Sequence, residues 1–286
     1  MKRKLPKLQI FVLLAVLLIA AGNSQHAHKA TVQQDIGPAS GTLIAVGGEA
    51  EALFRRFIGL AGGPAAKIVL IPTALADGSP QLKNLDGFAD HLRYSMGLPN
   101  LTVLHTRDRT LADSFPFVRP IQQADGVWFS GGRQWRLADA YLGTRTHVVL
   151  KKLLARGGII GGSSAGATIQ GSFLVRGDTK TNTIMVGDHQ VGLGFLRNVA
   201  IDQHVFERGR EFDLLKVVKA HPEVLGIGLD EKTGMIVRGD VMEVVGARYV
   251  YIYDSSRWKP DTPDTKKFFH LEAGDRYDLR KRRRMP

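Results

Sequence analysis

The chain has 286 residues, of which 44% are hydrophobic and 23% are charged. This length and composition exclude a disordered chain and a disulfide-stabilised miniprotein, and they allow one large domain or two small ones. The chain contains no cysteine, which excludes a disulfide framework, a zinc–thiolate site, an iron–sulfur cluster and a cysteine nucleophile.

The net charge of +12 is concentrated at the two ends of the chain. Four basic residues lie within the first seven, and five more occupy residues 280–284, so the body of the chain is close to neutral. No aromatic residues are interleaved with the terminal basic run, and no nucleic-acid-binding motif is present. We therefore expect no nucleic-acid partner, and we predict that residues 271–286 form a basic, solvated C-terminal tail.

Residues 1–22 have the three-part pattern of an export signal. A basic start is followed by an apolar run from Leu8 to Ala21 and then by small and polar residues. The run has about 14 residues, whereas a membrane-spanning helix needs about 20. Ala20 and Gly22 fit cleavage after Gly22. We predict export to the periplasm or the extracellular space, with no stable membrane span after cleavage; the alternative is an uncleaved single anchor.

From residue 41 onward, short apolar segments alternate with segments of helical length. Apolar strands without polar alternation, each followed by a helix, predict a three-layer α/β sandwich with a mostly parallel central sheet. Short extended segments after residue 233 predict an antiparallel C-terminal extension. With no repeat and no long linker, residues 41–270 are predicted to form one domain. The predicted parallel strands are 41–46, 67–71, 101–104, 126–129 and 158–160.

The motif Gly162-Ser163-Ser164-Ala165-Gly166 follows the last of these strands and precedes a segment compatible with a helix. Small flanking residues let the chain turn tightly from strand to helix, which exposes the central serine at the sheet edge. The start of the helix also directs backbone N–H groups toward a developing oxyanion. The motif predicts Ser164 as a nucleophile, and the alternative is a glycine-rich phosphate-binding type of loop.

A serine nucleophile needs a general base, and the base needs an orienting group. His204 and Glu231 each follow a predicted strand, so both are expected at a sheet edge. The resulting order Ser164, His204, Glu231 differs from the Ser, Asp/Glu, His order of α/β-hydrolases, which are therefore a poor template. The less suitable histidines are His189 in a loop, His221 before a proline, and His270 in the polar C-terminal part.

Several segments in chain order resemble the cyanophycinase and S51 serine peptidase family, whose fold is similar to the class I glutamine amidotransferase domain, a flavodoxin-like sandwich. The resemblance implies Ser164 as nucleophile, His204 as general base and Glu231 as its partner, with no metal and no cofactor. The matching segments are IAVGGEAE (44–51), AAKIVLIPTA (65–74), WFSGGRQWRL (128–137), GGSSAGATIQG (161–171), LGFLRNVAIDQHVFERGR (193–210) and GIGLDEKTG (226–234).

The resemblance also implies the groups around the triad. Backbone N–H groups at Gly132 and Ala165 would form the oxyanion hole. The residues implied to bind substrate are Gln134, Asp202, Gln203, Arg208 and Arg210.

Two departures from the family pattern concern the substrate. The family has Gly-Gly-Asp-Gln where this chain has Arg133 before Gln134, and a third arginine where this chain has Asp213. Arg208 and Arg210 can clamp substrate carboxylates, or they can pair with Glu207 and Glu211 on a helix face.

The sequence therefore predicts an exported cyanophycinase-like serine peptidase that hydrolyses β-aspartyl (isopeptide) bonds, such as those of cyanophycin, to yield β-Asp-Arg dipeptides. One alternative is an S51 peptidase that acts on another aspartyl peptide. The other is a non-catalytic exported binding protein with the same fold. The predicted partner is a peptide or a cyanophycin-like polymer, and a homodimer is left open.

Overall fold

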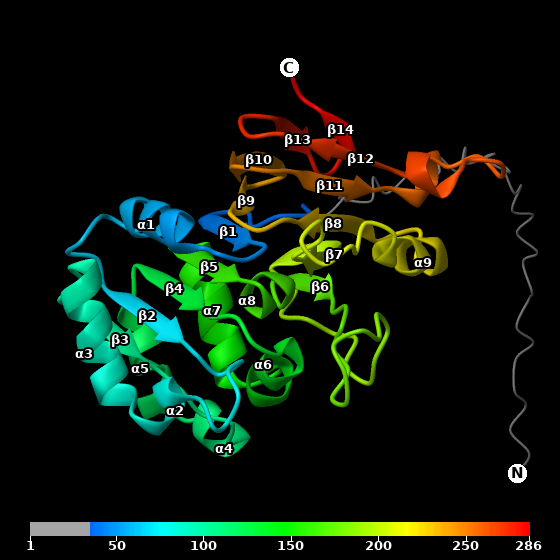
Figure 1. Ribbon diagram of the computed structural model, residues 1–286. Coiled ribbons are helices and arrows are strands. Elements are labelled where there is room, and N and C mark those ends of the chain that lie inside the picture. Colours follow the sequence, from blue (N-terminus) through cyan, green and yellow to red (C-terminus); the bar gives the residue numbers. More distant parts are fainter. Residues whose placement is uncertain (1–34) are drawn as a thin grey trace, which may run out of the picture. The chain divides into compact units, whose positions relative to one another are not determined.

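Two β-sheets and the helices around them make up residues 35–286, the part of the chain that the computed structural model describes (Figure 1). The predicted export signal at residues 1–22 lies outside this part. Within residues 35–286, no helix combines the length and the apolar character needed to cross a bilayer.

The larger sheet has nine strands in the order β14-β13-β10-β9-β1-β5-β4-β2-β3. Its parallel part consists of β1, β5, β4, β2 and β3. Strands β9, β10, β13 and β14 extend it in antiparallel fashion. The parallel strands are β1 (Thr42–Val46), β2 (Ile68–Ile71), β3 (Leu101–Val103), β4 (Gly126–Phe129) and β5 (Ile159–Ser163). The antiparallel strands are β9 (Thr233–Arg238), β10 (Val241–Gly246), β13 (Arg276–Asp278) and β14 (Arg283–Arg284).

Helices cover both faces of the parallel strands, which explains why these strands are apolar throughout. Successive residues of β1 point to opposite faces: Ile44 packs with α1, and Leu43 with the core on the α5–α7 side. The helices are α1 (Glu51–Leu60), α2 (Pro80–Lys83), α3 (Leu85–Met96), α4 (Arg109–Ala112), α5 (Phe115–Gln123), α6 (Gln134–Tyr141), α7 (Arg145–Ala155), α8 (Ala165–Thr168) and α9 (Asp213–Ala220).

The smaller sheet has five strands in the order β12-β11-β8-β7-β6. Strands β6 to β8 are parallel, and β11 and β12 are antiparallel additions. One face shares the core of the larger sheet through Ile201 and Ile227, and the other packs against Leu214 and Val218 of α9. The strands are β6 (Gly171–Phe173), β7 (Leu196–Gln203), β8 (Leu225–Leu229), β11 (Val250–Tyr253) and β12 (Phe268–Leu271), and two short 3₁₀ helices cover Ser255–Arg257 and Asp264–Lys266.

The α/β architecture, with parallel strands in the centre and antiparallel strands added later in the chain, is confirmed. The structure differs from the prediction in having two sheets instead of one. The chain leaves the larger sheet after β5, and the short helix α8 carries it to β6, where the second sheet begins. His204 and Glu231 therefore follow strands of the second sheet, whereas Ser164 follows β5 of the first.

The C-terminal residues also differ from the predicted solvated tail. Strand β13 pairs with β10, and β14 pairs with β13. The basic side chains between them find acidic partners far away in the sequence: Arg280 contacts Asp35 and Asp240, and the Arg282 Nη1 lies 2.8 Å from an oxygen of Asp254. These ion pairs hold a basic segment against the fold.

Candidate active site

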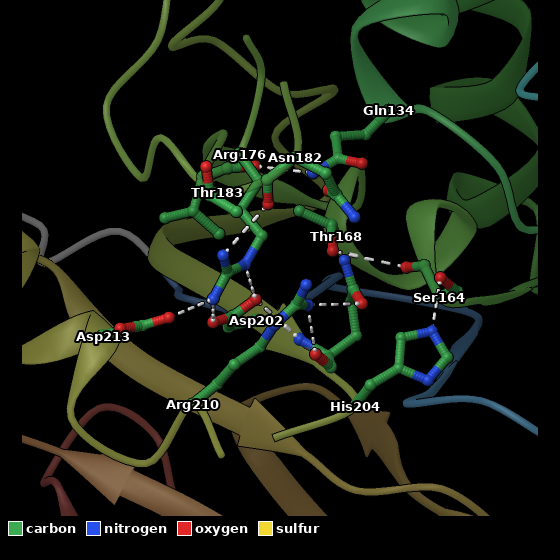
Figure 2. A network of polar contacts seen from close by, with 12 residues as sticks. Gln134, Ser164, Thr168, Arg176, Asn182, Thr183, Asp202, His204, Arg210 and Asp213 are labelled. Atoms are coloured by element: carbon green, nitrogen blue, oxygen red, sulfur yellow. Dashed lines mark hydrogen bonds and ion pairs between the residues drawn. The ribbon is translucent and has the colours of Figure 1, made fainter. Parts of the chain in front are cut away.

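The structure brings Ser164, His204 and Glu231 together at the carboxyl ends of their strands. The His204 Nε2 lies 2.9 Å from the Ser164 Oγ, and its Nδ1 lies 2.8 Å from a carboxylate oxygen of Glu231. Figure 2 shows the imidazole of His204 facing the hydroxyl of Ser164. This imidazole can accept the hydroxyl proton on one nitrogen while the carboxylate holds the other.

The turn around Ser164 requires its glycines. Ser164 has φ 53° and ψ −114°, a strained conformation for a residue with a side chain. A Cβ atom on Gly162 would lie 2.3 Å from the Gly166 carbonyl oxygen, and one on Gly166 would lie 2.2 Å from that of Phe129. Only glycine at both positions lets the chain turn closely enough to present the hydroxyl at the sheet edge.

The loop after β1 packs directly against the imidazole of His204. A Cβ atom on Gly48 would lie 2.4 Å from the His204 Cε1, so the ring occupies the space that a side chain would take. Gly48 also forms a bridge with Glu231. The next residue, Glu49, has φ 42° and pairs with Lys232 at 2.9 Å. This loop of the larger sheet thus fixes two groups supplied by the smaller one.

The surroundings keep His204 uncharged at neutral pH. Burial, together with the positive charges of Arg208 and Arg210, lowers the pKa of His204 to about 4. Burial and the neighbouring Glu49 carboxylate raise the pKa of Glu231. A neutral imidazole is the form that can accept a proton from a hydroxyl group.

The predicted oxyanion hole lies next to Ser164. A Cβ atom on Gly131 would lie 3.3 Å from the Ser164 Cβ, so the Gly131-Gly132 turn borders the hydroxyl. Gly132 has φ 137°, and a Cβ atom there would lie 2.1 Å from the Ala74 carbonyl oxygen, so only glycine fits. Within residues 35–286, neither the Gly132 nor the Ala165 N–H donates a hydrogen bond, which leaves both available to an oxyanion.

The predicted substrate-binding residues occupy different environments. Arg210 is buried, and its Nη1 donates to the carbonyl and side-chain oxygens of Gln203 at 3.0 and 3.3 Å. Gln134 is also buried and donates to the Val175 carbonyl, while its side-chain oxygen has no partner among the described residues. Arg208 is exposed. Within the described part of the chain, neither arginine forms an ion pair, so the alternative pairing with Glu207 and Glu211 is wrong.

Asp202 is held by a residue that the sequence analysis missed. Arg176, 1% exposed, donates to both oxygens of the buried Asp202 at 2.7 and 2.8 Å and to Asp213 at 2.6 Å (Figure 2). Asp213, which reverses a charge relative to the family pattern, thus has a partner inside the protein. An arginine following the apolar segment Phe173–Val175 was the only signal for this cluster.

Arg133, the other departure from the family pattern, forms its hydrogen bonds within the protein. Its Nη2 donates to the Asp178 carbonyl at 2.6 Å and to the Thr181 carbonyl. Both acceptors belong to the loop between β6 and β7, which also supplies the Asn182 carbonyl to Arg176 at 3.1 Å. Arg133 and Arg176 therefore fasten this loop beside Gln134.

Comparison with known proteins gives the same family as the motifs. The sequence model described as peptidase family S51 matches residues 39–245. A cyanophycinase of Nostoc sp. is 29% identical over 249 residues, which cover 82% of each chain. A cyanophycinase of Geminocystis herdmanii is 32% identical over 207 residues, covering 71% of this chain and 74% of the relative.

Solved structures support the fold. A peptidase from an acI-B1 actinobacterium superposes with a TM-score of 0.64 at 23% identity, covering 85% of this chain and 98% of that one. A putative peptidase E from Listeria monocytogenes gives a TM-score of 0.50 at 15% identity, covering 73% and 100%. The predicted family is confirmed: the chain belongs to peptidase family S51 and is a serine-type peptidase.

Proposed function

We propose that the protein is a cyanophycinase-like peptidase that hydrolyses β-aspartyl (isopeptide) substrates through a Ser164–His204–Glu231 triad. The observation that carries this proposal is the position of His204, within 2.9 Å of the Ser164 hydroxyl and 2.8 Å of the Glu231 carboxylate. The cyanophycinases among its relatives support the substrate class.

The mechanism follows from these two distances. The neutral His204 takes the proton of Ser164 as the hydroxyl oxygen attacks the amide carbonyl, and Glu231 stabilises the imidazolium that forms. The N–H groups of Gly132 and Ala165 hold the oxyanion of the tetrahedral intermediate, where one such donor contributes about 3 kcal/mol. His204 then protonates the leaving amine. Water, deprotonated by the same imidazole, attacks the acyl-enzyme and releases the acid and the free serine.

Arg210 supports a substrate that carries a carboxylate. It is 8% exposed and, within residues 35–286, has no acidic partner within ion-pair distance. Burial and the nearby positive charge of Arg176 lower the pKa of Arg210 to about 10, so it still carries its charge at neutral pH. A buried cation without a counter-ion favours an anionic ligand, and an aspartyl residue in the substrate supplies one.

The Arg176 cluster favours a second candidate within the same family, a peptidase that acts on a different aspartyl peptide. Both oxygens of Asp202 already accept hydrogen bonds from Arg176. Asp202 is also fully buried, so a cationic group of a substrate would have to share this carboxylate with Arg176 inside the protein. A substrate without a cationic group near Asp202 binds without disturbing the buried Arg176–Asp202 ion pair.

Product analysis separates the candidates. We expect the full chain to convert cyanophycin to β-Asp-Arg, detected by mass spectrometry, and to react with a fluorophosphonate probe at Ser164. Cleavage of aspartyl dipeptides with no action on cyanophycin would establish the second candidate. A protein that neither cleaves any of these substrates nor takes up the probe would be a non-catalytic binding protein.

The lowered pKa of His204 predicts an unusual pH profile. Because the imidazole must be neutral to accept the serine proton, activity is lost as the pH falls through the pKa of His204, which is about 4. We expect kcat/KM to hold its plateau down to about pH 5 instead of declining near the ordinary imidazole pKa of about 6.5. Arg208→Gln should move the acid limb to higher pH, because it removes a positive charge. A limb centred near pH 6.5 in the unmodified enzyme would contradict the assignment.

The strand order and the N-terminal sequence support two further parts of the proposal, the fold class and export. The parallel strands lie in the order β3-β2-β4-β5-β1. The first four correspond to the 2-1-3-4 order of doubly wound flavodoxin-like sheets and support that fold class, whereas the fifth position is taken by β1, the first strand of the chain. The signal pattern at residues 1–22 supports export, so the substrate would be met outside the cytoplasm.

A further inference from the structure

The chain after β2 lies directly against the predicted oxyanion hole. The Ser130 N–H donates to the Ile71 carbonyl at 3.1 Å, and the Arg133 N–H donates to the Ala74 carbonyl at 2.8 Å. The Ala74 carbonyl also fills the space that a side chain on Gly132 would occupy, since a Cβ atom there would lie 2.1 Å from its oxygen. This one carbonyl group therefore contacts both residues of the Gly132–Arg133 peptide and limits how the turn can rotate.

Arg136 of α6 is a second donor to the same carbonyl. Its Nη1 lies 3.0 Å from the Ala74 oxygen. The side chain is half-buried, its guanidinium lies 5.2 Å from the centroid of the Trp135 ring, and its Nε is buried with no hydrogen-bond partner among the described residues. The carboxylate of the loop after β2, Asp77, pairs with Arg107 instead. The interaction that Arg136 makes with this loop is thus a charged hydrogen bond to one backbone oxygen.

The place of Arg136 is unfavourable for a cation. Burial and the positive charges of Arg107 and Arg133 lower the pKa of Arg136, and the Asp77 carboxylate offsets this only in part. A half-buried guanidinium among other guanidinium groups, with no acid of the described residues at ion-pair distance, costs the fold free energy. A local cost of this kind is expected at functional positions.

The rest of the loop after β2 has anchors of its own. On one side of Ala74, the Thr73 hydroxyl oxygen lies 2.6 Å from that of Tyr141. On the other side, Arg107 donates to the Leu75 carbonyl at 2.5 Å. Removing the α6 arginine should therefore free the Ala74 carbonyl without releasing the loop as a whole.

We propose that Arg136 is a positioning residue for the oxyanion hole. Its guanidinium holds the Ala74 carbonyl, and this carbonyl holds the Gly131-Gly132 turn with the Gly132 N–H directed at the oxyanion that forms on attack by Ser164. Arg136 acts through Ala74 and not on the substrate itself. The inference rests on the proposed function, because the oxyanion forms only if Ser164 is the nucleophile.

Arg136→Gln tests the inference through three readouts. We expect kcat on the aspartyl substrate to fall about tenfold to hundredfold, because an oxyanion donor worth about 10²–10³ in kcat is displaced but not removed. KM should change little, since Arg210 and Gln134 are untouched. The rate of labelling by a fluorophosphonate probe, which places a phosphoryl oxygen in the same hole, should fall in parallel. The acid limb of the pH profile should stay in place, because His204 keeps its surroundings.

Arg107→Gln is the matched control. It removes an arginine that holds the same loop through the Leu75 carbonyl and not through Ala74, so kcat should stay within about threefold even if the melting temperature falls. Arg136→Lys, which keeps a charged donor, should bring kcat back to within about threefold of the unmodified enzyme. Thermal melting verifies folding, and Arg136→Met takes the place of the glutamine variant if that variant does not fold.

Unchanged kcat and unchanged labelling in Arg136→Gln, or an equal loss of kcat in Arg107→Gln, would overturn the role of Arg136. Failure of the peptidase proposal would appear separately, as no labelling of the unmodified protein or as full activity of Ser164→Ala.

Discussion

Replacing Ser164 with alanine is expected to lower kcat on the isopeptide substrate by about 10⁴-fold or more. In the proposed mechanism the hydroxyl oxygen forms the acyl-enzyme, and without it His204 has no nucleophile at 2.9 Å to activate. KM should change little, because the variant keeps Arg210 and Gln134. Steady-state kinetics with mass detection of the product measures both parameters.

Two controls make the result specific. Alanine keeps the Cβ atom that the φ of 53° already tolerates, so the melting temperature should not fall. Ser163→Ala alters the preceding serine, whose hydroxyl makes no hydrogen bond within the described residues, and should retain most of the activity. A Ser164→Ala enzyme within tenfold of the unmodified rate would remove Ser164 from the mechanism.

The largest expected effect on stability comes from Arg176. Its replacement by methionine leaves Asp202 as a fully buried, uncompensated charge, because Arg176 binds both carboxylate oxygens. Breaking a buried ion pair in this way costs about 3–5 kcal/mol of unfolding free energy. Denaturant unfolding followed by circular dichroism measures the loss.

Partner variants separate charge from packing. Asp213 is 40% exposed, so Asp213→Asn should cost about 1 kcal/mol or less. The double variant Arg176→Met with Asp202→Leu removes both buried charges and should recover most of the stability lost in Arg176→Met alone. If Arg176→Met were as stable as the unmodified chain, the ion pair would contribute nothing to the fold.

The sequence was sufficient to predict that Ser164, His204 and Glu231 lie together, because its signals are local. Ser164, His204 and Glu231 each follow a short apolar strand, and parallel strands bring their carboxyl ends to one edge. Gly162 and Gly166 mark the turn around Ser164, since a Cβ atom on either would lie within 2.5 Å of a backbone atom. The three residues of the proposed triad could therefore be selected before any contact was known.

Partners that are far apart in the sequence could not be predicted in this way. Arg176 meets Asp202 and Asp213, which lie 26 and 37 residues later, and no periodicity links an arginine to a distant acid. The same reason explains the C-terminal segment, where Arg282 is neutralised by Asp254. The division into two sheets could not be predicted, because the apolar pattern of a strand does not indicate which sheet the strand joins.

Because the proposed nucleophile follows a strand of one sheet while its proposed base and carboxylate follow strands of the other, the proposed triad exists only when both sheets have formed. A growing chain that has completed only its first sheet carries an ordinary serine alcohol with no proton acceptor beside it. Hydrolytic capacity arises once the later strands have been synthesised and packed in place.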